Sequence, residues 1–126
     1  MLRRRPHLLA ALAGALLGAL AAPACSSKTP VDPHTLTAQE LYLHVRCDQC
    51  HGRGGEGGFM APPLRGIAEH WDRESLIEYL KDPRPVIERT PRLQQMKRRY
   101  SMEMRSFREL DEELRGRLAD WLLARP

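Results

Sequence analysis

The sequence contains too few cysteines for a disulfide scaffold, because only three occur in 126 residues. Cys47 and Cys50 lie three positions apart and are followed directly by His51, whereas Cys25 stands alone far upstream. Small disulfide-stapled proteins usually carry an even set of four or more cysteines. The cysteines therefore predict two unrelated kinds of site instead of a network of bridges.

Net charge and the side-chain pairs of hydrolytic enzymes are also scarce. The formal net charge is +4, and without the three arginines at positions 3–5 the chain has 17 basic against 16 acidic residues. The basic run at positions 97–99 is too short to indicate nucleic-acid binding, so we predict no nucleic-acid partner. No paired carboxylates and no nucleophile–base pair indicate hydrolysis, and we predict that the protein is not an enzyme.

No apolar run is long enough for a comfortable membrane span, which needs about 20 residues. The longest one, residues 8–22, contains only Ala, Leu and Gly and follows three arginines. The small residues of a cleavage site come next, as Ala22-Pro23-Ala24. This order is typical of a secretory signal peptide. We predict such a peptide over residues 1–24 and an exported mature chain.

Cys25 is the residue that would follow this cleavage, and Cys25-Ser26-Ser27 resembles the start of a mature bacterial lipoprotein. The resemblance implies a lipid anchor on Cys25 that holds the chain on the periplasmic side of a membrane, although Ala22 stands where such proteins usually carry leucine. Soluble secretion and an uncleaved anchor are alternatives. The Pro-, Ser- and Thr-rich stretch to residue 36 predicts a flexible tether. We therefore divide the chain into 1–24, 25–36 and a folded domain over 37–126.

The folded part shows helix signals but no strand pattern. Residues 37–40 form a capping box for a helix that runs into Cys47, and Asp72 and Asp111 are caps of two further helices. The last helix has an apolar stripe. We expect loops over 52–66 and 83–91 and a short helical piece over 92–99. Because long loops seldom fold alone in a small domain, we predict an all-α fold of three to five helices whose loops wrap around a bound group.

Residues 47–51, C-D-Q-C-H, have the spacing of a covalent haem attachment site. Two thiols about one helical turn apart can reach two vinyl groups of the haem ring, and the next imidazole can bind the iron. A zinc site would need a second ligand pair, for which only His44 and His70 are at hand. A thioredoxin-like cysteine pair would follow a strand. We therefore expect one covalently bound haem c with His51 as an iron ligand.

Four segments, in this order, resemble the class I c-type cytochromes. They are the haem pentapeptide, A-P-P-L-R-G at 61–66, L-I-E-Y-L-K-D-P at 76–83, and M-R-S-F at 104–107 before the last helix. The resemblance implies a cytochrome c fold around one haem. It also makes Met104 the second iron ligand, Pro62 the carbonyl that accepts from His51, and Leu64 an apolar contact of the haem.

The methionine ligand is the position with open alternatives. Met102 and Met96 could compete with Met104, and His44, His70 or an open iron site are further alternatives. Arg105 stands where the family usually has proline. A thioether favours ferrous iron and keeps it six-coordinate, which suits electron transfer. We therefore predict a one-electron carrier that works with redox partner proteins on the outer side of the cytoplasmic membrane. An electron-entry subunit of a larger redox enzyme and a haem-based gas or redox sensor are the alternatives.

Overall fold

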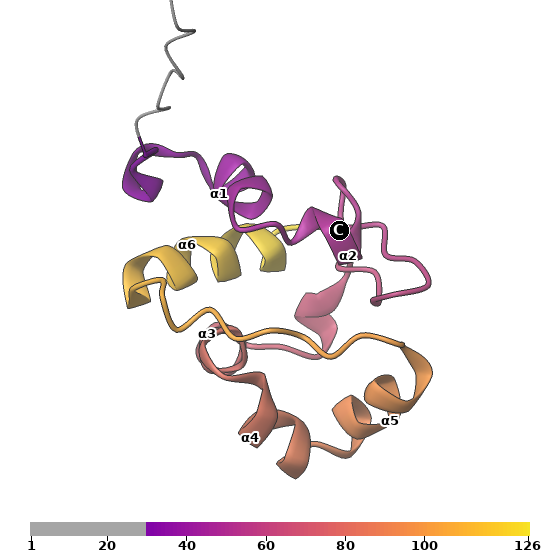
Figure 1. Cartoon of the computed structure of the whole chain (residues 1–126). Helices are drawn as coiled ribbons and strands as arrows, with labels where there is room; N and C mark the ends of the chain where they lie inside the picture. Colours follow the sequence, from indigo (N-terminus) through magenta and orange to yellow (C-terminus); the bar gives the residue numbers. More distant parts are fainter. Residues whose placement is uncertain (1–29) are drawn as a thin grey trace, which may run out of the picture. The chain divides into compact units, whose positions relative to one another are not determined.

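Six α-helices and two short 3-10 turns, with no strand, make up the part of the chain that the structure describes, residues 30–126 (Figure 1). The helices of this computed structural model are α1 (Ala38–His44), α2 (Asp48–His51), α3 (Arg73–Lys81), α4 (Pro83–Arg89), α5 (Pro91–Arg99) and α6 (Glu112–Leu123), and the 3-10 turns are η1 (Pro33–Thr35) and η2 (Ile67–Glu69). The all-α prediction is confirmed, with one helix more than expected. The predicted signal peptide and Cys25 lie outside the described residues, and no helix of residues 30–126 is long and apolar enough to cross a membrane.

Three helices begin where the sequence predicts. At α1 the Thr37 amide donates to the Glu40 carboxylate over 2.8 Å, and the Glu40 amide donates to the Thr37 hydroxyl over 3.2 Å. The carboxylates of Asp72 and Asp111 each accept from a backbone amide three residues on, over 2.7 and 2.9 Å. These bonds lower the pKa of both carboxyl groups. The caps satisfy amides that have no partner within the helix.

The predicted loop over 83–91 is wrong, because α4 occupies residues 83–89. Proline ends a preceding helix, but it is also favoured at the first position of the next one, where its missing N–H needs no partner. Pro83 both follows the end of α3 and occupies the first position of α4. Val86 and Ile87 of α4 are buried against Leu93 of α5 and form a small second apolar cluster. That contact supplies the packing that makes the short helix stable.

The first helix also differs from the prediction, since it ends at His44 and does not run into Cys47. Arg46 has a φ of 66°, in the left-handed region. The amide of Cys47 donates to the Tyr42 carbonyl and that of Arg46 to the Leu43 carbonyl, both over 3.1 Å. This pair of bonds is a Schellman motif, which usually has glycine at the left-handed position. It separates α1 from α2, so the haem pentapeptide starts a helix of its own.

The segment just before α1, assigned by sequence to the flexible tether, packs on α6. η1 is capped by Asp32, and the carbonyls of His34 and Leu36 accept hydrogen bonds from the Arg117 guanidinium. The folded part therefore begins before residue 37. The earlier part of the predicted tether lies outside the described residues.

The core lies where α1 and α3 pack against α6 (Figure 1). Leu41 of α1 and Leu118 of α6 are fully buried. The rings of Tyr42 and Trp121 lie 5.2 Å apart between the same two helices. The Tyr42 hydroxyl donates to the Gly52 carbonyl over 2.6 Å, just beyond α2. The core therefore holds the end of the haem pentapeptide in place.

Candidate functional site

A pocket of about 650 Å³ lies among α2, the segment after it, α3, α5 and the loop that precedes α6. This volume is within the roughly 300–1,000 Å³ of small-molecule sites. The structure brings together at this pocket all the predicted haem residues, namely Cys47, Cys50, His51, Pro62, Leu64 and Met104. Cys25 is the predicted site residue that lies outside the described chain.

The two thiols flank α2. Cys47 precedes the helix and is buried, while Cys50 lies in its single turn and is half-buried, and no disulfide joins them. Burial raises the pKa of the Cys47 thiol to about 12, so this thiol is neutral at ordinary pH. The short helix thus presents two thiols, about one turn apart, to the same pocket.

His51 is buried at the end of α2, and its Nδ1 lies 2.8 Å from the Pro62 carbonyl oxygen. Because a carbonyl can only accept, Nδ1 carries the proton and Nε2 keeps its lone pair. Burial lowers the pKa of the imidazole, and this effect outweighs the hydrogen bond to the Pro62 carbonyl, which raises it. The ring is therefore neutral. A neutral imidazole with a fixed tautomer is the form in which histidine binds a metal.

The glycine-rich loop places the Pro62 carbonyl. The Gly57 amide donates to the His51 carbonyl, and the Leu64 amide donates to the Gly55 carbonyl, both over 2.8 Å. Gly57 has a φ of +73°, and a Cβ there would lie 2.7 Å from the carbonyl carbon of Pro62. Only glycine allows this approach of two backbones. The sequence indicated a loop here, but it gave no sign that Gly57 supports His51.

Of the three candidate methionines, Met104 is the best placed. It is half-buried and packs against the main core, whereas Met102 is 55% exposed. Met96 packs against the second cluster, and its sulfur lies 3.5 Å from the Arg92 guanidinium. All three line the pocket. Packing against the core therefore favours Met104 as the thioether donor.

The loop that carries Met104 is fixed at its far end. Phe107 is buried, and its amide donates to the Leu80 carbonyl over 2.8 Å. The buried Arg115 of α6 donates to the carbonyls of Phe107, over 3.2 Å, and of Leu110. Nothing in the sequence pattern marks Arg115 as buried, because an arginine on an amphipathic helix ordinarily faces solvent.

Two aromatic side chains, Trp71 and Tyr79, form part of the pocket wall. The rings of Trp71 and Tyr79 lie 4.9 Å apart, and the Arg92 guanidinium lies 5.3 Å from the centre of the Trp71 ring. Burial raises the pKa of the Tyr79 phenol to about 12, so it stays neutral. This wall adds apolar surface on the side of α3 and α5.

The donors suit haem c and not a zinc ion. Within residues 30–126 no three His, Cys, Asp or Glu side chains are grouped so that they could hold a metal ion. His44 and His70 are both exposed, and His44 lies outside the pocket. Two thiols beside one imidazole, a soft thioether and an apolar enclosure are instead what a covalently held iron porphyrin needs.

Comparison with known proteins agrees with this geometry. The cytochrome c family model matches residues 36–125. Cytochrome c-555 of Methylococcus capsulatus is 40% identical to the chain over 68 residues, which are 54% of this chain and 54% of that protein. The chain thus matches only about half the length of this curated relative, and no solved structure matches it significantly. Because the family match includes the whole pocket, the chain belongs to the cytochrome c family, whose members carry covalently attached haem c.

Proposed function

We propose that this protein is a one-electron carrier whose haem c is joined to Cys47 and Cys50 and ligated by His51 and Met104. The observation that carries the proposal is that a neutral, buried His51 and the core-packed Met104 line one pocket. With His51 and Met104 as its ligands, the haem iron would have no position open for a substrate. Haem c supplies the one-electron couple.

The chain's own residues set the properties of that couple. The Pro62 carbonyl fixes the orientation of His51 and increases its basicity. The Met104 thioether favours the reduced state, and the apolar wall limits the access of water. These effects suit exchange of electrons with redox partner proteins, as a free carrier or as the electron-entry subunit of a larger complex.

Absorption spectra test the ligand set. The oxidised protein should show the weak far-red band of a sulfur–iron bond, and the reduced protein should bind CO slowly. Met104→Ala should lose the far-red band, while Met102→Ala, the matched control in the same loop, should keep it. The reverse pattern would contradict the assignment. Rapid CO binding by the unaltered protein would favour the sensor function instead.

We also propose that the mature chain is exported and held at the periplasmic side of the membrane by lipid on Cys25, with the folded domain standing off on a short tether. The amino-terminal sequence pattern supports this proposal. Mass spectrometry of the membrane-bound protein should show acyl groups on Cys25, and Cys25→Ala should move the protein into the soluble fraction. An unmodified Cys25 in the mature membrane-bound chain would contradict it.

A further inference from the structure

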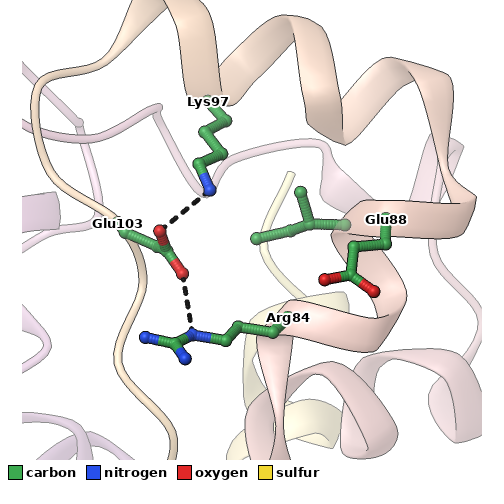
Figure 2. Close-up of a pocket in the computed structure, with 5 residues that line it drawn as sticks. Arg84, Glu88, Lys97 and Glu103 are labelled. Carbon is green, nitrogen blue, oxygen red and sulfur yellow. Dashed lines mark hydrogen bonds and ion pairs between the residues drawn. The ribbon is translucent and has the colours of Figure 1, made fainter.

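Glu103, the residue before Met104, forms ion pairs with two helices (Figure 2). One carboxylate oxygen lies 3.0 Å from Nζ of Lys97 on α5, and the other lies 3.4 Å from Nε of Arg84 on α4. The three side chains line a second, smaller cavity of about 300 Å³, between these helices and the loop before α6. Glu103 and Lys97 also line the haem pocket. Glu103 and Lys97 therefore lie in the wall between the two cavities, and Arg84 lines the smaller one.

The ion pairs of Glu103 matter because the loop has little other support on the amino-terminal side of Met104. Among residues 30–126, no backbone hydrogen bond joins residues 101–106 to the rest of the chain. The nearest backbone bonds are at Tyr100, at the end of α5, and at Phe107. Among residues 30–126, Arg105 forms its ion pair with Glu109 in the same loop region, and its guanidinium lies 4.5 Å from the centre of the Phe107 ring. Phe107 fixes the loop after Met104, and before it the ion pairs of Glu103 are what joins the loop to the helices.

We propose that Glu103 is a positioning residue, which through Arg84 and Lys97 keeps Met104 against the haem and so determines how readily another ligand displaces the thioether. The inference rests on the proposed function, because it requires Met104 to be the ligand. Glu103 itself touches neither the haem iron nor a substrate in this role. Its effect is on the population of the loop arrangement in which Met104 is bound.

The exposure of the three side chains sets the size of the effect. The Glu103 side chain is 36% exposed, Lys97 is 53% exposed and Arg84 is 80% exposed. Exposed ion pairs are individually weak, so loss of this pair of contacts should raise the apparent affinity for a competing ligand about three- to tenfold. The loop should loosen without releasing Met104 altogether.

Titration of the oxidised, haem-loaded full chain with imidazole measures this population through loss of the far-red sulfur–iron band. Glu103→Gln should bind imidazole about three- to tenfold more tightly than the unaltered protein. Glu88→Gln is the matched control, because Glu88 lines the same cavity and Figure 2 shows no ion pair between its carboxylate and the other cavity residues drawn there. It should bind imidazole as the unaltered protein does, and both variants should unfold at similar temperatures.

Two further arms separate positioning from a general charge effect. Lys97→Gln should raise imidazole affinity in the native background but add little in the Glu103→Gln background, as expected for residues that act through one contact. In about 1 M salt, where exposed charges are screened within roughly 3 Å, the difference between Glu103→Gln and the unaltered protein should shrink.

Equal imidazole affinity in Glu103→Gln and the unaltered protein would overturn the inference while leaving the electron-carrier proposal intact. An equal rise in the Glu88→Gln control would overturn it as well, since net charge alone would then explain the change. If Met104→Ala keeps the far-red band, the ligand assignment itself fails, and the role of Glu103 fails with it.

Discussion

Gly57 keeps the Pro62 carbonyl within reach of His51, although its own contacts are with backbone. Gly57→Ala would place a methyl group 2.7 Å from the Pro62 carbonyl carbon, at a φ of +73° that L-residues rarely adopt. The left-handed conformation alone costs about 1–2 kcal/mol, and the close contact adds to it. We expect Gly57→Ala to lower the free energy of unfolding, measured in urea, by about 2–4 kcal/mol. It should also shift the reduction potential of the haem.

Gly58 offers the control for that substitution within the same loop. A Cβ at Gly58 meets no atom within 4 Å, and its φ is not in the left-handed region. Gly58→Ala should therefore leave both the unfolding free energy and the potential almost unchanged. If the two alanine variants behaved alike, the close approach at Gly57 would not be what places the carbonyl.

Arginines two residues apart on α6 hold different parts of the chain. Arg115 is buried and donates to the carbonyls of Phe107 and Leu110, next to the Met104 loop. Arg115→Met would leave the Leu110 carbonyl buried without a donor, at about 1–3 kcal/mol for an unsatisfied group, while the Phe107 carbonyl would keep the Leu110 amide as a donor over 3.2 Å. We expect the free energy of chemical unfolding to fall by about 1–3 kcal/mol and the far-red band to weaken.

Arg117→Met is the comparison at the same helix. Arg117 donates to the carbonyls of His34 and Leu36, far from the methionine loop. This variant should speed amide hydrogen exchange at residues 34–36 and leave the far-red band intact. A weakened band in Arg117→Met would mean that α6 affects Met104 as a whole and not through Arg115.

The cap of α3 predicts a pH dependence of stability. The Asp72 carboxylate accepts from the Ser75 amide, which lowers its pKa in the folded chain. A carboxyl group with a lowered folded pKa stabilises the fold above its unfolded pKa, near 3.9, and this contribution is lost as pH falls through the folded value. The melting temperature of Asp72→Ala should therefore be below that of the unaltered protein at pH 7, and the gap should narrow below about pH 4.

Asp72→Asn provides the control, because asparagine also caps helices but does not titrate in this range. Its stability should depend less on pH than that of the unaltered protein between about pH 5 and 2. A gap between Asp72→Ala and the unaltered protein that stayed constant down to pH 2 would contradict the role of the carboxylate charge.

Helix ends that depend on neighbouring residues could be predicted from the sequence. The differences between prediction and structure arise mainly where contacts with residues distant in the sequence decide the conformation. The caps at Thr37, Asp72 and Asp111 depend on neighbouring residues, so the sequence located all three helix starts. α4 was missed because its stability comes from burial against α5, and the break in α1 because its left-handed residue is the unusual Arg46.

The same distinction applies to the candidate site. The haem pentapeptide is contiguous, and its spacing was enough to predict the pocket residues of α2. The roles of Gly57, Glu103 and Arg115 come from the backbones and helices that they meet in space. No local sequence pattern indicates such contacts. From residue type alone, Gly57 is therefore interpreted as a loop glycine, and Glu103 and Arg115 as surface charges.

At the scale of the whole molecule, fold and cofactor depend on each other. Without haem, the apolar walls of this pocket of about 650 Å³ would face water, although burial of apolar surface is the main favourable contribution to folding. Proteins are stable by only roughly 5–15 kcal/mol. The double variant Cys47→Ala, Cys50→Ala, prepared without haem, should therefore lose its cooperative unfolding transition and much of its far-UV circular dichroism. A haem-free chain with full helix content and a sharp transition would contradict this prediction.

The burial of Cys47 also has a consequence for the order of haem attachment and folding. In the folded arrangement Cys47 is only 8% exposed and belongs to the main core with Tyr42 and Leu118. A separate protein that attached haem would need access to this sulfur, which the closed core does not give. We therefore expect attachment at Cys47 to come before the core around α1 closes, while the newly made chain is still open. The finished core would then enclose the bonded sulfur for as long as the protein stays folded.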